Sequence, residues 1–167
     1  MKKISLLIII ITVWSFGSFA IGFNWVVKSG NYESICSDAK DNLYTTGQVP
    51  LLKYNKAGVL IKTISNTGNG IFNGMALTVD PTGNIYLSGQ LASTFTIGTH
   101  SVTSEGQGDA ILIKFDSACN ILWIKSGKGV GNESATDMAV DTDGNVYECG
   151  IFGSSANFDG DSITGNG

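Results

Sequence analysis

Two pairs of aspartates, with one residue between the members of each pair, have the type and spacing that could bind a metal ion. Asp141 and Asp143 lie in VDTDGNVYECG, and Asp159 and Asp161 lie in NFDGDS. Calcium takes about six to eight oxygen ligands, mostly from carboxylates, amides and backbone carbonyls of one loop. Asp159 and Asp161 are therefore candidate calcium ligands, and the sequence indicates no other cofactor.

The first pair belongs to a stretch that occurs three times, and the copies favour a hairpin turn over a metal loop. The earlier copies are SDAKDNLYTTGQ and VDPTGNIYLSGQ, and the second of them keeps Asp80 as its only acid. A metal loop is not expected to lose ligands between copies. In a D-x-x-G-N turn the aspartate accepts backbone N–H bonds, and the glycine supplies the positive φ of a type I turn with a bulge. The residues with this predicted turn role are Asp38, Asn42, Asp80, Gly83, Asn84, Asp141, Gly144 and Asn145.

The remaining reactive side chains suggest no catalytic residue. His100 is the only histidine, and its segment GTHSVT is predicted to be an exposed outer strand. Cys36, Cys119 and Cys149 lack the CxxC spacing of zinc sites, so we expect at most one disulfide and at least one free thiol. The sequence has no GxSxG stretch, and its glycine-rich stretches do not match phosphate-binding loops.

The composition predicts a folded, turn-rich β protein as the framework for these residues. The chain has 167 residues, of which 43% are hydrophobic, with 22 Gly and only 2 Pro. Its formal net charge is −4, and no cluster of Lys or Arg follows Lys3. Nucleic acid and anionic membrane surfaces, which require basic patches, are therefore not expected as partners.

Residues 1–20 are predicted to be a secretory signal peptide. Lys2 and Lys3 precede an apolar run over 4–14, and residues 18–20 fit the small-x-small pattern of a cleavage site. The run is short for a membrane span of about 20 residues, so a retained anchor is the weaker alternative. We expect an exported protein, secreted or at the cell surface, with no membrane span after cleavage.

Residues 21–167 are predicted to form one region built from repeats. Asp38 and Asp80 lie 42 residues apart, and Asp80 and Asp141 lie 61 apart. A second landmark, LLKYNKAGVLIK, recurs as ILIKFDSACNILWIK at the same spacing of 61. The two periods differ by one insertion in the second unit, LASTFTIGTHSVTSEGQGD, and the third unit begins its own version, IFGSSANFDGDSITGNG.

Each unit contains about four short β-type runs, which in the middle unit cover 75–79, 84–88, 110–115 and 121–125. No segment has helical periodicity. The pattern predicts an all-β fold, a partial β-propeller of repeated four-stranded antiparallel blades with two full units and part of a third. Because closed propellers have about four to eight blades, we expect a chain truncated at its C-terminus and completed by further blades or by self-association.

The stretches GMALTVDPTGNIYLSGQ and SATDMAVDTDGNVYECG resemble the SBBP-type β-propeller repeat of secreted bacterial proteins. DAILIKFDSACNILWIKSGKG resembles the strand that follows in the same repeat, and the likeness covers most of the chain from Gly22 onward. The resemblance implies a structural or binding repeat without a shared catalytic residue. The chain departs from the family pattern at Asp41 and Cys119, where turn glycines are expected.

These observations favour a non-catalytic scaffold or binding module, exported from the cell, with a protein or a glycan as its ligand. Two alternatives stay open, because a fold says little about function. The chain could be the N-terminal part of a propeller enzyme, a hydrolase or lyase whose catalytic residues lie beyond residue 167. It could also be a structural protein of adhesion or surface assembly.

Overall fold

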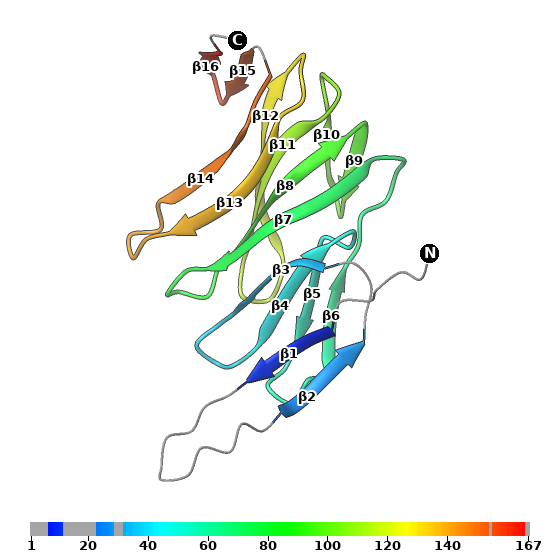
Figure 1. Cartoon of the computed structure of the whole chain (residues 1–167), viewed down its shortest axis with the longest axis vertical. Coiled ribbons are helices and arrows are strands. Elements are labelled where there is room, and N and C mark those ends of the chain that lie inside the picture. Colours follow the sequence, from blue (N-terminus) through cyan, green and yellow to red (C-terminus); the bar gives the residue numbers. More distant parts are fainter. Residues whose placement is uncertain (1–6, 12–22, 29–31, 154, 166–167) are drawn as a thin grey trace.

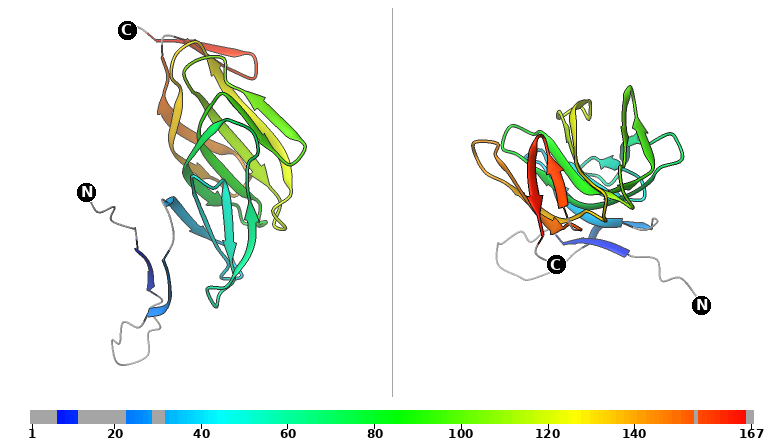
Figure 2. Two further views of the ribbon diagram at one scale, coloured as in Figure 1. Left: turned by 90° about the vertical axis from the view of Figure 1, so that its right-hand side faces the viewer. Right: turned by 90° about the horizontal axis from the view of Figure 1, so that it is seen from above.

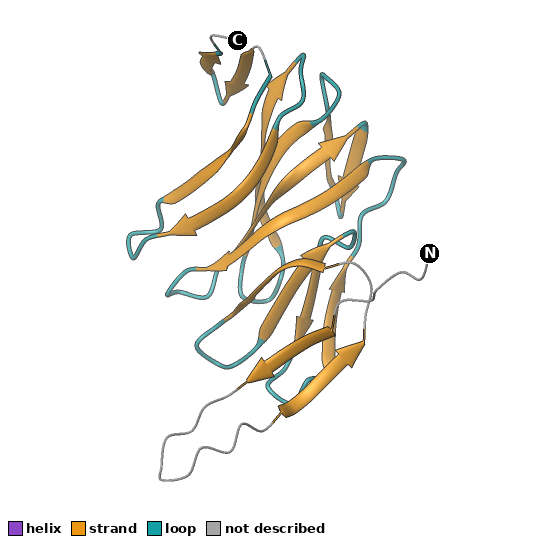
Figure 3. Ribbon diagram, viewed as in Figure 1, coloured by secondary structure: helices purple, strands orange, loops and turns teal. Residues whose placement is uncertain are grey.

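The computed structural model describes residues 7–11, 23–28, 32–153 and 155–165. Strands account for 64% of the described residues, which contain no helix (Figure 3), so the predicted all-β fold is confirmed. It follows that this part of the chain contains no helix able to cross a membrane.

The first repeat unit forms a four-stranded antiparallel sheet in which neighbours in sequence are neighbours in space (Figure 1). Tight turns join its first strand to its second and its third to its fourth. The strands are β3 (Tyr32–Ser37), β4 (Leu43–Gly47), β5 (Leu51–Tyr54) and β6 (Leu60–Ile64).

The second unit contains all four of the predicted strands, and they lie side by side in one sheet in chain order. The inserted segment forms a separate hairpin between the second and third of them. The four strands are β7 (Ile71–Val79), β8 (Ile85–Ala92), β11 (Asp109–Phe115) and β12 (Ile121–Gly129). The hairpin consists of β9 (Thr94–Ile97) and β10 (His100–Thr103).

The third unit contributes an antiparallel pair, β13 (Ser134–Val140) and β14 (Val146–Ile151). The hairpin that follows, β15 (Ser155–Phe158) and β16 (Asp161–Thr164), does not join this pair. Instead β15 pairs with β12, so the sheet of the second unit has six strands in the order β16-β15-β12-β11-β8-β7.

The hairpins β9–β10 and β15–β16 make the same contact in successive units. Thr96 of β9 forms a bridge with Thr67, just before the second unit begins. Asn157 of β15 pairs with Lys128, just before the third unit begins. Both partners are displaced by 61 residues, so each hairpin reaches back to the segment that precedes the first strand of its own unit.

A further antiparallel pair, β1 (Leu7–Ile11) with β2 (Phe23–Lys28), lies near the N-terminus. Figure 2 shows it at the opposite end of the long axis from β15–β16. The predicted leader covers 1–20, of which 1–6 and 12–20 lie outside the described residues. The signal peptide therefore stays a prediction.

The units pack through their first strands, because β7 contacts β3 and β13 contacts β7. The principal core lies between the first two units and joins Tyr44 and Leu51 to Ile85, Leu87 and Phe115, all with no exposed side-chain surface. Burying a large apolar side chain contributes roughly 1.5–3 kcal/mol, so this interface holds the two units together. The described sheets do not close into a ring.

Candidate functional site

The turn between β7 and β8 is held by one carboxylate. Oδ1 of Asp80 accepts the backbone N–H groups of Thr82 and Asn84, both at 2.9 Å. Oδ2 accepts the amide of Asn84 at 2.8 Å and the hydroxyl of Tyr86 at 3.2 Å. The hydroxyl of Thr82 adds a further bond to Oδ1 at 2.7 Å. Asp80 therefore replaces the missing backbone partners of the turn and anchors the strand that follows.

Asp38 and Asp141 have the same four types of bond. Each accepts the N–H groups two and four residues later, the asparagine amide four later and the tyrosine hydroxyl six later, at 2.8–3.2 Å. The donors are Lys40, Asn42 and Tyr44 for the first turn, and Asp143, Asn145 and Tyr147 for the third. The tyrosine belongs to this pattern, and sequence reasoning had not given it a role in the turn.

Each of these turns needs a left-handed residue at its fourth position. Gly83 and Gly144 have φ of 89° and 84° there, and Asp41 has 61°. Two more turns share the design without having been included in the predicted signature: Asn55 begins one and Asp116 the other. In the second of these, Cys119 is left-handed with φ of 65°. Asp41 and Cys119 thus lie at the equivalent left-handed position of two different turns, where a residue other than glycine is strained.

The three signature turns converge on one hollow. They lie along the left edge of the molecule in Figure 1, and the hollow between them has a volume of about 460 Å³. Lys53 lines it as well, and its Nζ donates to the backbone oxygen of Ser117 at 2.9 Å. Residues from all three units therefore surround a single space.

Positions that differ between the turns line this hollow together with the recurring ones. The second residue of the turn is Ala39, Pro81 or Thr142, and all three are lining residues. The recurring aspartates also border the space, but their oxygens are engaged inside the turns. The frame of the hollow is thus constant, while its chemical surface varies from unit to unit.

The electrostatics of the turns make the aspartates poor proton donors. Burial would raise the pKa of Asp80, but hydrogen bonds from Thr82, Asn84 and Tyr86 outweigh it and lower the pKa to about 2. The pKa of Asp38 is lowered in the same way, against the effect of burial. At Asp141 the bonds from Asn145 are the main cause of a lowered pKa. All three carboxylates are ionised at neutral pH and are unsuited to general acid catalysis.

The calcium candidates form a hairpin turn of another kind. Asp159 and Gly160 have φ of 53° and 103°, which two-residue hairpin loops require at both positions. Asp159 forms an ion pair with Lys125, and Asp161 begins β16. Within the described residues no three His, Cys, Asp or Glu side chains lie close enough to hold a metal ion. His100 is exposed at the start of β10.

The three cysteines are all unpaired, and their surroundings differ. Burial, reinforced by the charge of Asp38, raises the pKa of Cys36 to about 12. Burial also raises the pKa of Cys119. Neither thiol is therefore activated as a nucleophile. Cys149 is exposed on β14.

Sequence reasoning missed a fully buried acid, Glu133. Its Oε1 accepts the backbone N–H of Gly153 at 3.2 Å, and its Oε2 has no hydrogen-bond partner among the described residues. A side chain at Gly129 would collide with its carboxyl group. Phe72 occupies the position 61 residues earlier, so the repeat contains no signal for an acid at this point.

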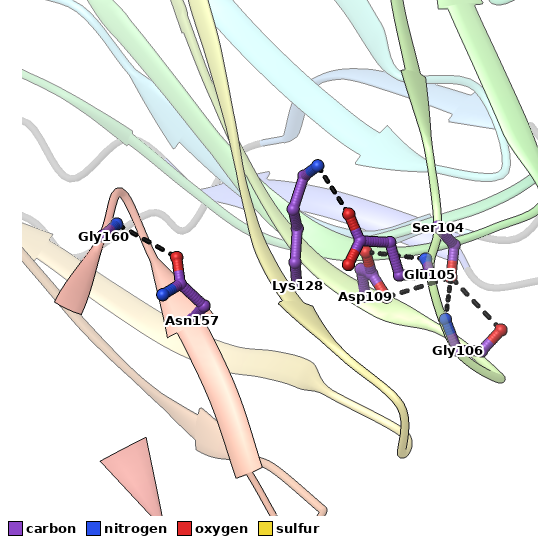
Figure 4. Close-up of polar contacts among 7 residues, drawn as sticks. All are labelled: Ser104, Glu105, Gly106, Asp109, Lys128, Asn157 and Gly160. Carbon is purple, nitrogen blue, oxygen red and sulfur yellow. Dashed lines mark hydrogen bonds and ion pairs between the residues drawn. The ribbon is translucent and has the colours of Figure 1, made fainter. Parts of the chain in front are cut away.

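A second buried acid, Asp109, fixes the start of β11 (Figure 4). Its Oδ1 accepts the hydroxyl of Ser104 at 3.0 Å, and its Oδ2 accepts the N–H of Glu105 at 3.3 Å. Lys128 of β12 donates to Oε1 of Glu105 at 2.6 Å across the same loop. These bonds give the Asp of DAILIKF a structural role.

Comparisons with known proteins add no relative to this description: no protein-family model matches the chain, and no match was found among curated proteins.

Proposed function

We propose that the chain is a non-catalytic binding module built from propeller-type blades, exported from the cell, whose ligand is a protein or a glycan. The ligand would meet the hollow formed by the three signature turns. The resemblance to the SBBP-type repeat and the apolar leader support export and the blade arrangement, and both belong to this proposal.

The blade arrangement is supported by the order of the strands. The first unit is a four-stranded meander, and the second has the same order once its inserted hairpin is set aside. The first strands of the three units pack against one another in succession. In a propeller such strands surround the axis, and the loops at one end of the axis form the common binding surface.

The observation that supports the binding function is that recurring and variable residues of the turns have different roles. The recurring Asp, Asn and Tyr side chains form hydrogen bonds within the turns. The lining positions Ala39, Pro81 and Thr142 differ in size and polarity. A frame of constant geometry with variable residues on its inner side is suited to recognition. It provides no paired nucleophile and base for a reaction.

A matched pair of tryptophan variants tests this proposal. Ala39 and Ala57 are both exposed and lie in turns of the same design, but only Ala39 lines the hollow. The purified chain and the variants Ala39→Trp and Ala57→Trp are applied to a glycan array and to a displayed peptide library. We expect ligands that bind the natural chain and Ala57→Trp but not Ala39→Trp. Absence of any ligand, or equal binding by both variants, would contradict the proposal.

A further inference from the structure

The outer edge of β14 differs from the corresponding edges in the first two units. β4 is paired on that side with β5, and β8 is paired there with β11. Among the described residues β14 pairs with β13 alone, and Figure 1 shows it at the margin of the molecule. Tyr44 and Tyr86 are completely buried, whereas the equivalent Tyr147 is 61% exposed.

An apolar groove of about 620 Å³ lies beside this edge. It runs between β14 and the face of β11 and β12, and the hairpin β15–β16 borders it. Its apolar lining includes Ile111, Leu112, Ile151, Phe152, Phe158 and Ile163. One lining residue differs in kind from the repeat pattern: Glu148 stands where the second unit has Leu87.

The corresponding space between the first two units is filled by a strand of the chain itself. Ile113 and Phe115 of β11 belong to the same buried cluster as Tyr44 and Leu51 of the first unit. β11 simultaneously pairs along the whole of β8. The molecule therefore contains one filled version of the groove and one in which no described strand covers β14.

We propose that β14 accepts an antiparallel strand from a further repeat unit of this type, with the pattern D-A, three apolar residues, Lys and an aromatic residue. Strand addition supplies main-chain hydrogen bonds to the free edge, and alternate side chains enter the groove. The inference rests on the repeat arrangement proposed above and is independent of ligand binding at the hollow.

The period of 61 residues fixes the register of the added strand. In the second unit Leu112 lies opposite Ser88, and Lys114 lies opposite Tyr86. Moving β8 onto β14 by 61 residues puts the leucine position of the strand opposite Cys149 and its lysine opposite Tyr147. A slip of one residue would turn every side chain to the wrong face.

The lysine in this pattern has a recurring partner. Nζ of Lys53 lies 5.2 Å from the ring centre of Tyr44, and Nζ of Lys114 lies 4.8 Å from that of Tyr86. Within the described residues no lysine lies over Tyr147. Because a cation over an aromatic face is attracted by the ring electrons, the added strand is expected to contribute a lysine at this position.

Cross-linking to the exposed thiol of Cys149 tests both the docking and its register. The probes are synthetic peptides of residues 107–117, QGDAILIKFDS, each with one cysteine activated as a mixed disulfide. Opposed residues of paired strands satisfy disulfide geometry, whereas their neighbours point to the other face. The Leu112→Cys peptide is therefore expected to couple to Cys149 at least about tenfold faster than the Ile111→Cys and Ile113→Cys peptides. Mass spectrometry identifies the cysteine that reacts.

Variants of the tyrosine and the lysine test the contact between them. Replacing Lys114 by Glu in the Leu112→Cys peptide is expected to slow coupling by about threefold or more, because the ring no longer faces a cation. In the protein, Tyr147→Ala should abolish this difference and Tyr147→Phe should retain it. Leu122→Ala, at an exposed position elsewhere, is the matched control and should change nothing.

Equal coupling by all three cysteine peptides would overturn the proposal. So would a chain that is dimeric on its own with Cys149 protected, because a second copy would then be the occupant of the groove. Binding at the hollow, measured with the Ala39→Trp and Ala57→Trp pair, is read separately. Failure of strand docking can therefore be told apart from failure of the proposed function.

Discussion

At the scale of single residues, the signature aspartates make the same hydrogen bonds in surroundings that differ. Asp80 and the ring of Tyr86 are buried, whereas Asp141 is half-buried and Tyr147 is exposed. The same substitution should therefore lower the free energy of unfolding by different amounts. Leaving a buried hydroxyl without an acceptor costs more free energy than leaving a solvated one, to which water can bond.

Asp80→Ala is expected to lower the free energy of unfolding by about 2–4 kcal/mol, because it leaves several buried donors unpaired. Asp141→Ala should cause a clearly smaller loss, because water can replace the carboxylate. Urea unfolding of both variants measures the difference. Equal losses would mean that burial does not determine the contribution of the turn.

The ionised form of Asp80 should also make the fold sensitive to acid. Its pKa is about 2 in the folded chain, against 3.8 ordinarily. The stabilisation is complete above pH 3.8 and is lost as the pH falls to about 2, and a shift of this size corresponds to about 2 kcal/mol. Asp80→Asn should therefore flatten the dependence of the free energy of unfolding on pH between 4 and 2.

At the scale of elements, five hairpin turns share one backbone design, and two of them lack glycine at the left-handed position. Asp41 is exposed there, so only backbone strain opposes the residue. Cys119 has the same conformation, but it is buried in the core cluster and contributes packing. Asp41 and Cys119 thus share the strained backbone conformation, but only at Cys119 does burial in the core offset the cost of that strain.

Asp41→Gly is expected to raise the free energy of unfolding by about 0.5–1 kcal/mol, because glycine adopts a positive φ without steric cost. Gly144→Ala is the reciprocal change at an equivalent exposed turn, and it should destabilise by about 1 kcal/mol. Thermal and urea unfolding provide the measurement. A destabilised Asp41→Gly variant would show that the Asp41 side chain stabilises the fold by more than its left-handed backbone conformation destabilises it.

The strands and signature turns were predictable because each depends on local sequence. Alternating apolar residues indicate a β-strand, and an aspartate four residues before an asparagine indicates a turn. Neither signal depends on where the element packs in the molecule. The pairing of β15 with β12 depends instead on which sheet edge is near, and local patterns do not contain that information. Buried Glu133 was missed for the same reason, since its carboxyl group lies against Gly129 at the end of β12 and Gly153 after β14, which only the packing brings together.

At the scale of the whole molecule, two four-stranded units and the first strand pair of a third are joined in succession, and the exposure of equivalent positions differs between them. The strand β8 is almost entirely buried, whereas its counterpart β14 is almost entirely exposed. Identical repeat positions thus become core or surface depending on whether a following strand covers them. We infer from this difference that the edge of β14 accepts a strand like the one that covers β8 in the second unit.

Hydrogen exchange of the β14 amides in an extended chain tests this claim most directly. The extension appends residues 107–129 after Gly167, in the order that the 61-residue period specifies. Exchange across Val146–Ile151 is predicted to slow by at least about tenfold relative to the natural chain. A control extension with the same residues in scrambled order should leave it unchanged. Unchanged exchange in the ordered extension, or equal slowing in both, would contradict the account.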